Sequence, residues 1–362
     1  MFDFVPIDKY AFFYNHFFLI ATLFTILHCL ALQINDRKNL VFLNSFGYIA
    51  LLFTVLYIGL RPISGVFVDM TTYAYTFERF QDNNPINYEE DYGFYYFLII
   101  CTKIMNKELF FLVCASIYVL PLFFISKKFF KEYWFYSFLM FCISLSFWNF
   151  GTNGIRNGMA TSLFILAISF YKNKYFSISL MLISCSFHQT MILPTAAYTL
   201  TLINNNTNKY LIVWIVSIPI SFISGNFLIK YIEISGIGVE KVGSYFTENI
   251  DEGFSKTGFR WDFLIYSSLA VFSGGYFIYR KKFKDVFYTQ LYNVFLIANT
   301  AWILIIQVNF SNRFAYLSWF LMALVIIYPL LKANFFKNQN KVIAGILFLY
   351  FSFTYFLNVI LV

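Results

Sequence analysis

The chain has 362 residues, of which 60% are hydrophobic and only 12% are charged. Soluble proteins carry about twice that share of charge, so a water-soluble globular protein is excluded. The 50 phenylalanines and 28 tyrosines likewise exclude a disordered chain. The net charge of +8 comes from short basic clusters between apolar runs, which indicates cytoplasmic loops under the positive-inside rule rather than a nucleic-acid partner.

Long apolar runs follow one another from Tyr10 to the end of the chain. A helix needs about 20 residues to cross the hydrocarbon core, and the first run is too long for a signal-peptide core. The lengths predict an all-α polytopic membrane protein with about 12 crossings, folded as a single integral membrane domain over residues 1–362. The predicted spans are residues 10–32, 40–60, 108–125, 133–150, 155–171, 175–187, 189–203, 210–232, 261–279, 285–308, 313–331 and 341–361.

Charge predicts how these spans are oriented. If the short apolar piece Phe94–Met105 does not cross, the Lys-rich short loops share one face, with 15 basic and three acidic residues. We therefore expect both termini outside, and a re-entrant or interfacial helix, or an outer extension of the next span, at Phe94–Met105. The two sizeable loops, about 61–93 and 233–260, are then external, so the chemistry is expected at the outer face.

Arginines gather at the predicted outer ends of the spans, where an unpaired charge is costly. Arginine often snorkels to the interface, but lysine does so equally well, and the predicted inner face uses mostly lysine. Boundary arginines on the outer face therefore indicate a planar, bidentate clamp for an anion. These residues are Arg61, Arg156, Arg260 and Arg313.

Arg156 carries the clearest signal. It follows the turn Gly151–Gly154 and lies in the first turn of a predicted helix, where free backbone N–H groups and the helix dipole favour a bound phosphate. His188 lies at the predicted outer end of a short span. A lone histidine is more often structural, but the arginines in the same boundary layer make His188 a candidate catalytic residue.

The external segment 61–93 is acidic and aromatic. Tyr73 and Tyr92 lie beside its acidic residues and could stack on sugar rings. The run Glu89-Glu90-Asp91 could hold a divalent cation, but without a paired acidic cluster a solvated loop is favoured. No nucleotide-binding loop or metal motif occurs, and the cysteines fall in apolar stretches, so we expect no metal or cofactor.

One series of motifs follows a family order. Arg156-Asn157-Gly158-Met159-Ala160 is followed some thirty residues later by Phe187-His188-Gln189-Thr190 and Pro194, and this resembles the EpsG/Wzy group of bacterial polysaccharide polymerases. Two departures are Gly65, which lies four residues ahead of Asp69 where the group has a closer glycine, and Asp91, where the group usually has Glu. Further matches are Leu60-Arg61-Pro62, Asp69 with Tyr73, Tyr92-Gly93-Phe94, Gly258-Phe259-Arg260-Trp261, and Arg313 with Tyr316.

The resemblance implies a membrane glycosyltransferase. It would join undecaprenyl-diphosphate-linked repeat units into the O-antigen of lipopolysaccharide or into an exopolysaccharide, at the periplasmic face of the inner membrane. Its partners would be the lipid-linked donor and acceptor glycans and the membrane lipids, with a chain-length regulator protein as a further candidate.

The resemblance also implies roles for the candidate residues. Arg156, Arg260 and Arg313, with Arg61 as a weaker candidate, would stabilise the departing diphosphate in place of a metal ion. His188, Asp69 or Asp91 would be the general base on the acceptor hydroxyl, and the sequence does not choose among them.

Three alternative functions stay open. An O-antigen ligase-like transferase would use the same donor but needs room for a second lipid. A membrane O-acyltransferase would use His188 as its base and leaves the arginines unexplained. A polysaccharide flippase needs polar residues at the bilayer midplane and at both faces, whereas here they gather at one.

Overall fold

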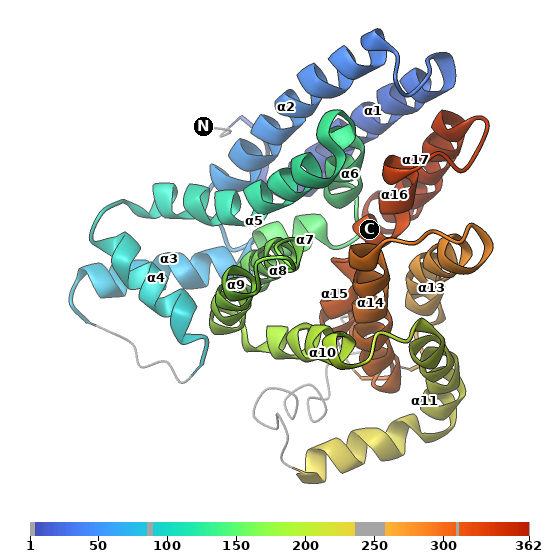
Figure 1. Cartoon of the computed structure of the whole chain (residues 1–362). Coiled ribbons are helices and arrows are strands. Elements are labelled where there is room, and N and C mark those ends of the chain that lie inside the picture. Colours follow the sequence, from blue (N-terminus) through green and yellow to red (C-terminus); the bar gives the residue numbers. More distant parts are fainter. Residues whose placement is uncertain (1–3, 85–89, 236–257, 309–310, 362) are drawn as a thin grey trace. The chain divides into compact units, whose positions relative to one another are not determined.

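The computed structural model of the protein describes residues 4–84, 90–235, 258–308 and 311–361 (Figure 1). Every regular element in these ranges is a helix, as the apolar runs predict. The chain divides into two compact units, unit 1 with Met1–Ile192 and Ile327–Val362, and unit 2 with Leu193–Ile326. A single integral membrane domain over the whole chain stays a prediction.

Unit 1 holds the N-terminal helices and the last helix of the chain. Its short helical turns are η1 (Ile7–Lys9), η2 (Lys131–Tyr133), η3 (Gln189–Met191) and η5 (Phe356–Ile360). Its α-helices are α1 (Tyr10–Ala31), α2 (Arg37–Gly59), α3 (Val68–Gln81), α4 (Tyr92–Thr102), α5 (Lys107–Phe130), α6 (Trp134–Cys142), α7 (Phe147–Thr152), α8 (Ile155–Ser169), α9 (Lys174–Phe187) and α17 (Gln339–Tyr355).

Unit 2 is built around α14, which packs against α11, α13 and α15. Trp214 of α11 donates to Asn299 of α14, and this buried hydrogen bond of 2.7 Å ties the two helices together. The elements of this unit are α10 (Ile192–Ile203), α11 (Thr207–Ser235), α13 (Trp261–Gly275), η4 (Tyr276–Arg280), α14 (Val286–Leu304), α15 (Ser311–Trp319) and the first part of α16 (Met322–Lys332).

Within the described ranges, five helical segments are long and apolar enough to cross a membrane. The predicted count of about 12 crossings is not confirmed. Helices α8 and α9 have only 15 and 14 residues, or about 22 Å of rise against a core of about 30 Å. The five segments are Ile7–Ala31, Arg37–Gly59, Lys107–Cys142, Ser311–Lys332 and Gln339–Ile360.

Two predicted connections are themselves helical. The segment 61–93, which we expected to be an external loop, contains α3, whose buried and exposed residues alternate with helical spacing. The apolar piece Phe94–Met105 corresponds to α4, a separate helix, because α5 begins anew with Asn106 accepting from Leu109 N–H at 2.9 Å. Most of the other predicted loop, 233–260, lies outside the described residues.

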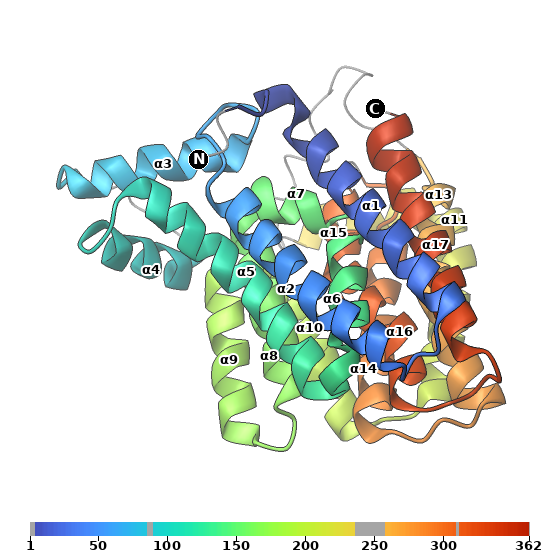
Figure 2. The ribbon, with the colours of Figure 1, turned by 90° about the horizontal axis from the view of Figure 1, so that it is seen from above.

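Serine hydroxyls fix how α8 and α9 pair. Ser177 and Ser184 of α9 donate to the backbone carbonyls of Ala167 and Ala160 at 2.8 and 2.7 Å. The order of these contacts makes the helices antiparallel, and Figure 2 shows them side by side below α5. Small hydroxyl-bearing residues allow such close contact between apolar helices. This register places the end of α9 beside the start of α8.

A glycine permits the close approach of α7 to α8. A Cβ at Gly158 would collide with the backbone carbonyl oxygen of Phe150, at a position where the carbonyl cannot retreat without moving α7. Only a residue without a side chain fits there. The start of α8, with Arg156, is therefore held against α7.

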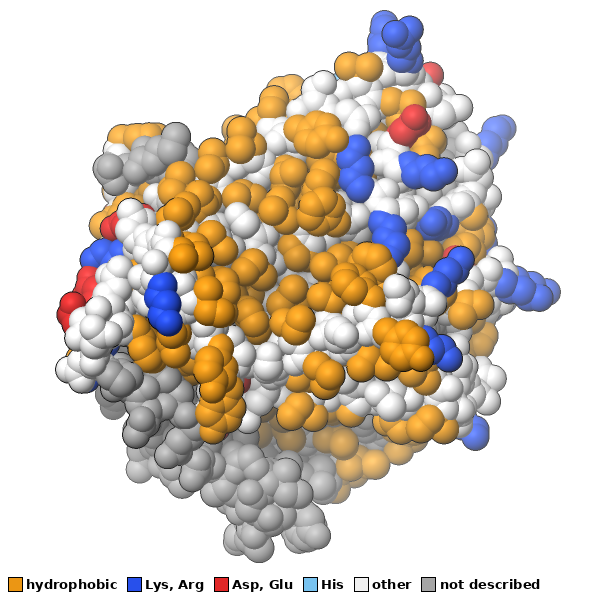
Figure 3. Space-filling view, turned by 60° about the vertical axis from the view of Figure 1, so that its left-hand side comes forward, with side chains coloured by type: hydrophobic (Ala, Val, Ile, Leu, Met, Phe, Trp, Pro, Cys, Tyr) orange, Lys and Arg blue, Asp and Glu red, His pale blue; other side chains and the backbone are white. Residues whose placement is uncertain are grey.

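The surface of unit 1 fits a protein dissolved in lipid. Helix α5 begins with Lys107 and Glu108 and ends near Lys127 and Lys128, with an almost uninterrupted apolar stretch between them. On the face of the molecule shown in Figure 3, hydrophobic side chains cover a broad area and most of the charged side chains lie toward its margins. Such a distribution is typical of a surface in contact with acyl chains.

Substitution of the close-approach glycine tests this packing. We expect Gly158→Ala to lower the free energy of unfolding by about 1–3 kcal/mol, because the added methyl group overpacks the α7–α8 contact. Thermal unfolding of the detergent-purified protein measures the effect. Gly345→Ala is the control, because a Cβ at that position of α17 meets nothing within 4 Å, and this change should be neutral or stabilise by up to about 1 kcal/mol. Equal melting temperatures for the two variants would contradict the assignment.

Candidate functional site

The carboxylate of Asp91 connects three segments of unit 1. Asp91 is the N-cap of α4 and adopts a left-handed backbone conformation with φ 53°, which aspartate tolerates better than most residues. One carboxylate oxygen accepts from Nη1 of Arg156 at 2.8 Å, and the other accepts from the backbone N–H of Gln189 at 2.8 Å. The side chain of Asp91 is 0% exposed. A single buried carboxylate thus joins the starts of α4 and α8 to the turn after α9.

Aromatic rings surround the Arg156 guanidinium. Its central carbon lies 5.5, 5.9 and 5.7 Å from the ring centroids of Tyr73, Phe94 and Tyr95. Its Nη1 also donates to the Tyr95 hydroxyl at 3.4 Å, while Nε is buried without a hydrogen-bond partner among the described residues. Cation–π contacts of this kind hold a guanidinium in one orientation. The side chain nevertheless keeps 21% of its surface exposed.

The start of α8 is an uncapped helix N-terminus. Its N-cap is Gly154, which has no side chain to accept from the first-turn N–H groups. Arg156 lies in that same first turn, so a planar cation and the positive end of a helix dipole occur together. This combination suits a phosphate group.

His188 borders the same cluster, as the C-cap of α9. Its Nδ1 accepts from the backbone N–H of Thr190 at 3.3 Å and lies 2.7 Å from the Thr190 hydroxyl oxygen. His188 is half-buried. It is held by the same turn whose next residue, Gln189, donates to Asp91.

Tyr73 links the arginine to the other candidate carboxylate, Asp69. Both lie on α3, one helical turn apart, and so share a face of that helix. Burial raises the pKa of the Tyr73 hydroxyl; the positive charge of Arg156 opposes this rise and the negative charge of Asp69 adds to it. Tyr73 is buried and packs on Arg156, whereas Tyr92, the other predicted sugar-stacking residue, is exposed.

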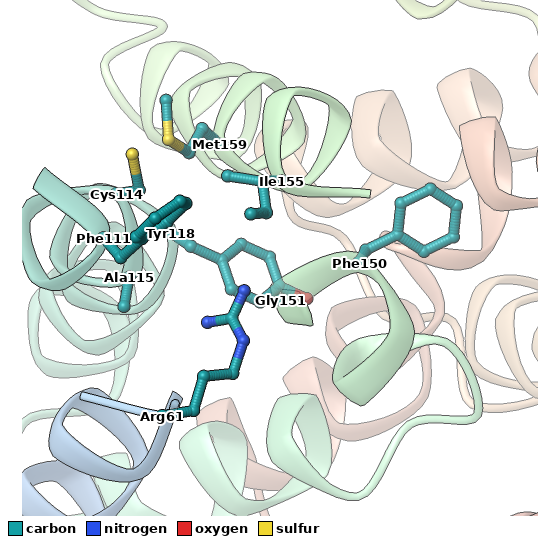
Figure 4. A pocket seen from close by; sticks show the side chains of 9 residues that line it. All are labelled: Arg61, Phe111, Cys114, Ala115, Tyr118, Phe150, Gly151, Ile155 and Met159. Atoms are coloured by element: carbon teal, nitrogen blue, oxygen red, sulfur yellow. The ribbon is translucent and has the colours of Figure 1, made fainter. Parts of the chain in front are cut away.

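Arg61 is buried rather than located at a surface boundary. It is 4% exposed and donates to the backbone carbonyl oxygens of Ile58 and Thr152, the latter at 3.0 Å. Burial lowers its pKa to about 10, so the guanidinium stays charged at neutral pH. Figure 4 shows the side chain reaching from the end of α2 into a small pocket, toward Tyr118 and Gly151. The pocket is lined by Arg61, Phe111, Cys114, Ala115, Tyr118, Phe150, Gly151, Ile155 and Met159.

The remaining two candidate arginines belong to unit 2. Arg260 is the N-cap of α13 and pairs with Asp262 through two hydrogen bonds of 2.9 and 2.6 Å, with its guanidinium 3.5 Å from the Phe263 ring centroid. Arg313 lies on the exposed side of α15. Unit 1 therefore brings Arg156, His188, Asp91, Asp69 and Tyr73 together, whereas a joint role with Arg260 and Arg313 stays a prediction.

A sequence model of one family matches residues 44–362, which include all of unit 2 and unit 1 from within α2 onward. The chain belongs to the EpsG family. Membership of this family indicates a polysaccharide polymerase type of function, with glycosyltransferase-like chemistry. No curated protein and no solved structure gives a significant match.

The EpsG-type motifs have a physical explanation in this cluster. A Cβ at Gly93 would collide with the side chain of Ser186, so the glycine of Tyr92-Gly93-Phe94 lets α4 pack directly on the end of α9. That contact places Asp91 against the turn after His188. The motifs that carry the family resemblance are therefore far apart in the chain, but their residues lie close together in the fold.

Gln189 is a site residue that the sequence analysis did not single out. It contributes its backbone N–H, which any residue could provide, so its identity carried no signal. Among the described residues, no group of three or more His, Cys, Asp or Glu side chains could hold a metal ion. Glu89 lies outside those residues.

Removing the central carboxylate tests its role in the fold. We expect Asp91→Ala to lower the free energy of unfolding by about 3–5 kcal/mol, because the partly buried Arg156 loses its counter-ion. The double variant Asp91→Ala/Arg156→Leu should regain part of this loss. Thermal unfolding of the purified protein measures both.

The control is the exposed ion pair of Lys107 and Glu78, in which the side chains are 36% and 49% exposed. Glu78→Ala should cost no more than about 1 kcal/mol, because solvent screens this pair. A loss for Asp91→Ala as small as that for Glu78→Ala would contradict a structural role of the Asp91–Arg156 pair.

Proposed function

We propose that this EpsG-family protein joins undecaprenyl-diphosphate-linked repeat units into a surface polysaccharide, at the periplasmic face of the bacterial inner membrane. The growing chain leaves its lipid carrier and is transferred to the non-reducing end of the next lipid-linked unit. The donor already carries an activated leaving group, so the reaction needs no nucleotide. Family membership supports the polymerase class.

The arrangement around Arg156 supports the lipid-linked donor and is the observation on which the proposal depends. A departing diphosphate carries concentrated negative charge, and oriented donors in a site of low dielectric stabilise such charge more than water does. Arg156 is held in place by Asp91 and by aromatic rings, and it lies beside the uncapped start of α8. This preorganisation means that little reorientation is needed when charge develops on the leaving group.

The other candidate residues take separate parts in the proposal. Arg260 and Arg313 of unit 2 would add positive charge around the diphosphate. Arg61 binds the carbonyl of Thr152 at the end of α7, so we assign it to positioning the connection from α7 to α8 rather than to the diphosphate. Exposed tyrosines on α4, Tyr92 and Tyr96, offer faces on which sugar rings can stack.

The conservative variant Arg156→Lys tests this function. Lysine can keep an ion pair with Asp91 but loses the planar donor fork, so we expect a protein of normal abundance that makes at least about 100-fold less polymer. Gel ladders of the surface polysaccharide, made in cells lacking the native copy, measure the product, and immunoblots measure the protein.

Arg79→Lys is the matched control. Arg79 lies on α3 and hydrogen-bonds to Tyr75 and to the carbonyl of Asn84, away from the cluster around Asp91. Its ladders should equal those of the wild type. Normal ladders from Arg156→Lys would remove Arg156 from the mechanism, and a wild-type protein that forms no polymer from purified lipid-linked units would refute the function itself.

A further inference from the structure

The proposed function requires a proton acceptor for the attacking hydroxyl, and the following inference rests on that function. A carboxylate is the usual base in glycosyl chemistry. The sequence offers three candidates, Asp69, Asp91 and His188. The environments of these groups differ enough to assign a different role to each of them.

Asp91 is already fully engaged by the protein. Both of its oxygens accept hydrogen bonds, from Arg156 and from the backbone of Gln189, and its side chain is 0% exposed. A substrate hydroxyl cannot reach it in this arrangement. Protonation would also remove the charge that balances Arg156. Asp91 is therefore a positioning residue that acts through Arg156.

His188 is engaged by its own turn. Its Nδ1 accepts from the backbone N–H of Thr190 at 3.3 Å and lies 2.7 Å from the Thr190 hydroxyl oxygen. The same turn holds the Gln189 N–H that donates to Asp91. We therefore assign His188 to positioning this turn, and the base to one of the two carboxylates.

Asp69 is less enclosed than Asp91. It is half-buried in the first turn of α3, one turn before Tyr73, whose ring packs on Arg156. Its charge reaches Tyr73, where it adds to the effect of burial in raising the pKa of that hydroxyl. The carboxylate thus lies one helical turn from the aromatic ring that supports the arginine, without being enclosed as Asp91 is.

We propose that Asp69 is the general base that accepts the proton of the acceptor sugar hydroxyl, while Asp91 positions Arg156. In this step the hydroxyl oxygen forms a bond to the anomeric carbon of the donor, and its proton passes to the Asp69 carboxylate. The bond between the anomeric carbon and the phosphate oxygen breaks, and its electron pair leaves with the diphosphate. Arg156 balances the charge on that group, and Asp69 later returns the proton to water.

The experiment compares Asp69→Asn with Asp91→Asn in purified protein given a synthetic polyprenyl-diphosphate-linked repeat unit. Asparagine preserves shape in both cases and tolerates the left-handed conformation at position 91. For Asp69→Asn we expect kcat to fall by about 100-fold or more, with unchanged KM and melting temperature. For Asp91→Asn we expect a lower melting temperature and weaker donor binding, read as a smaller thermal shift on adding a polyprenyl diphosphate.

Two controls separate base chemistry from folding. Asp82→Asn changes an exposed carboxylate at the other end of α3 and should leave kcat unchanged. Asp69→Glu keeps a carboxylate and should restore part of the activity. Wild-type kcat in Asp69→Asn would overturn the assignment, as would an Asp91→Asn variant that loses kcat but keeps its melting temperature and donor binding. A wild-type protein that does not elongate the repeat unit would instead refute the proposed function, whichever variant is stable.

Discussion

The pairing of Asp91 with Arg156 is the interaction on which the candidate site depends. A partly buried guanidinium among aromatic rings is costly unless a counter-ion and hydrogen bonds compensate it. Asp91 provides both, and its second oxygen binds the backbone after His188. The electrostatic requirement of one arginine therefore determines how α4, the start of α8 and the end of α9 come together. Because both oxygens of Asp91 are bound in this way, its side chain has no exposed surface that a substrate could contact.

Small residues make that electrostatic arrangement sterically possible. Gly93 brings α4 onto α9, Gly158 brings α8 onto α7, and Ser184 ties α9 to α8 through a carbonyl of α8. Helices in lipid gain little from burying apolar surface against each other, so packing at small residues and hydrogen bonds must hold them. The glycines of the EpsG-type motifs can thus be understood as close-contact positions that bring the polar residues of the same motifs within bonding distance.

The two acidic residues of this region illustrate how environment separates roles. Asp91 is enclosed and neutralises Arg156, whereas Asp69 lies in the first turn of α3, half-buried and close to Tyr73. An enzyme that cleaves a glycosyl diphosphate needs positive charge at the leaving group and a proton acceptor at the nucleophile. In the proposed mechanism, Arg156 and Asp69 meet these two requirements from two helices of one unit.

The sequence by itself determined the helical membrane class, because long apolar runs with little charge have no stable alternative in water. It also placed Arg156 in a first helical turn and His188 at a helix end, since both positions follow from local turn and periodicity signals. It did not reveal α3 within an acidic segment, nor the breaks between α6 and α7 and between α15 and α16, because composition does not show where packing interrupts an apolar run. The pairing of Asp91 with Arg156, 65 residues apart, was decided only by tertiary structure. It depends on how α4 packs against α9, and no local pattern carries that information.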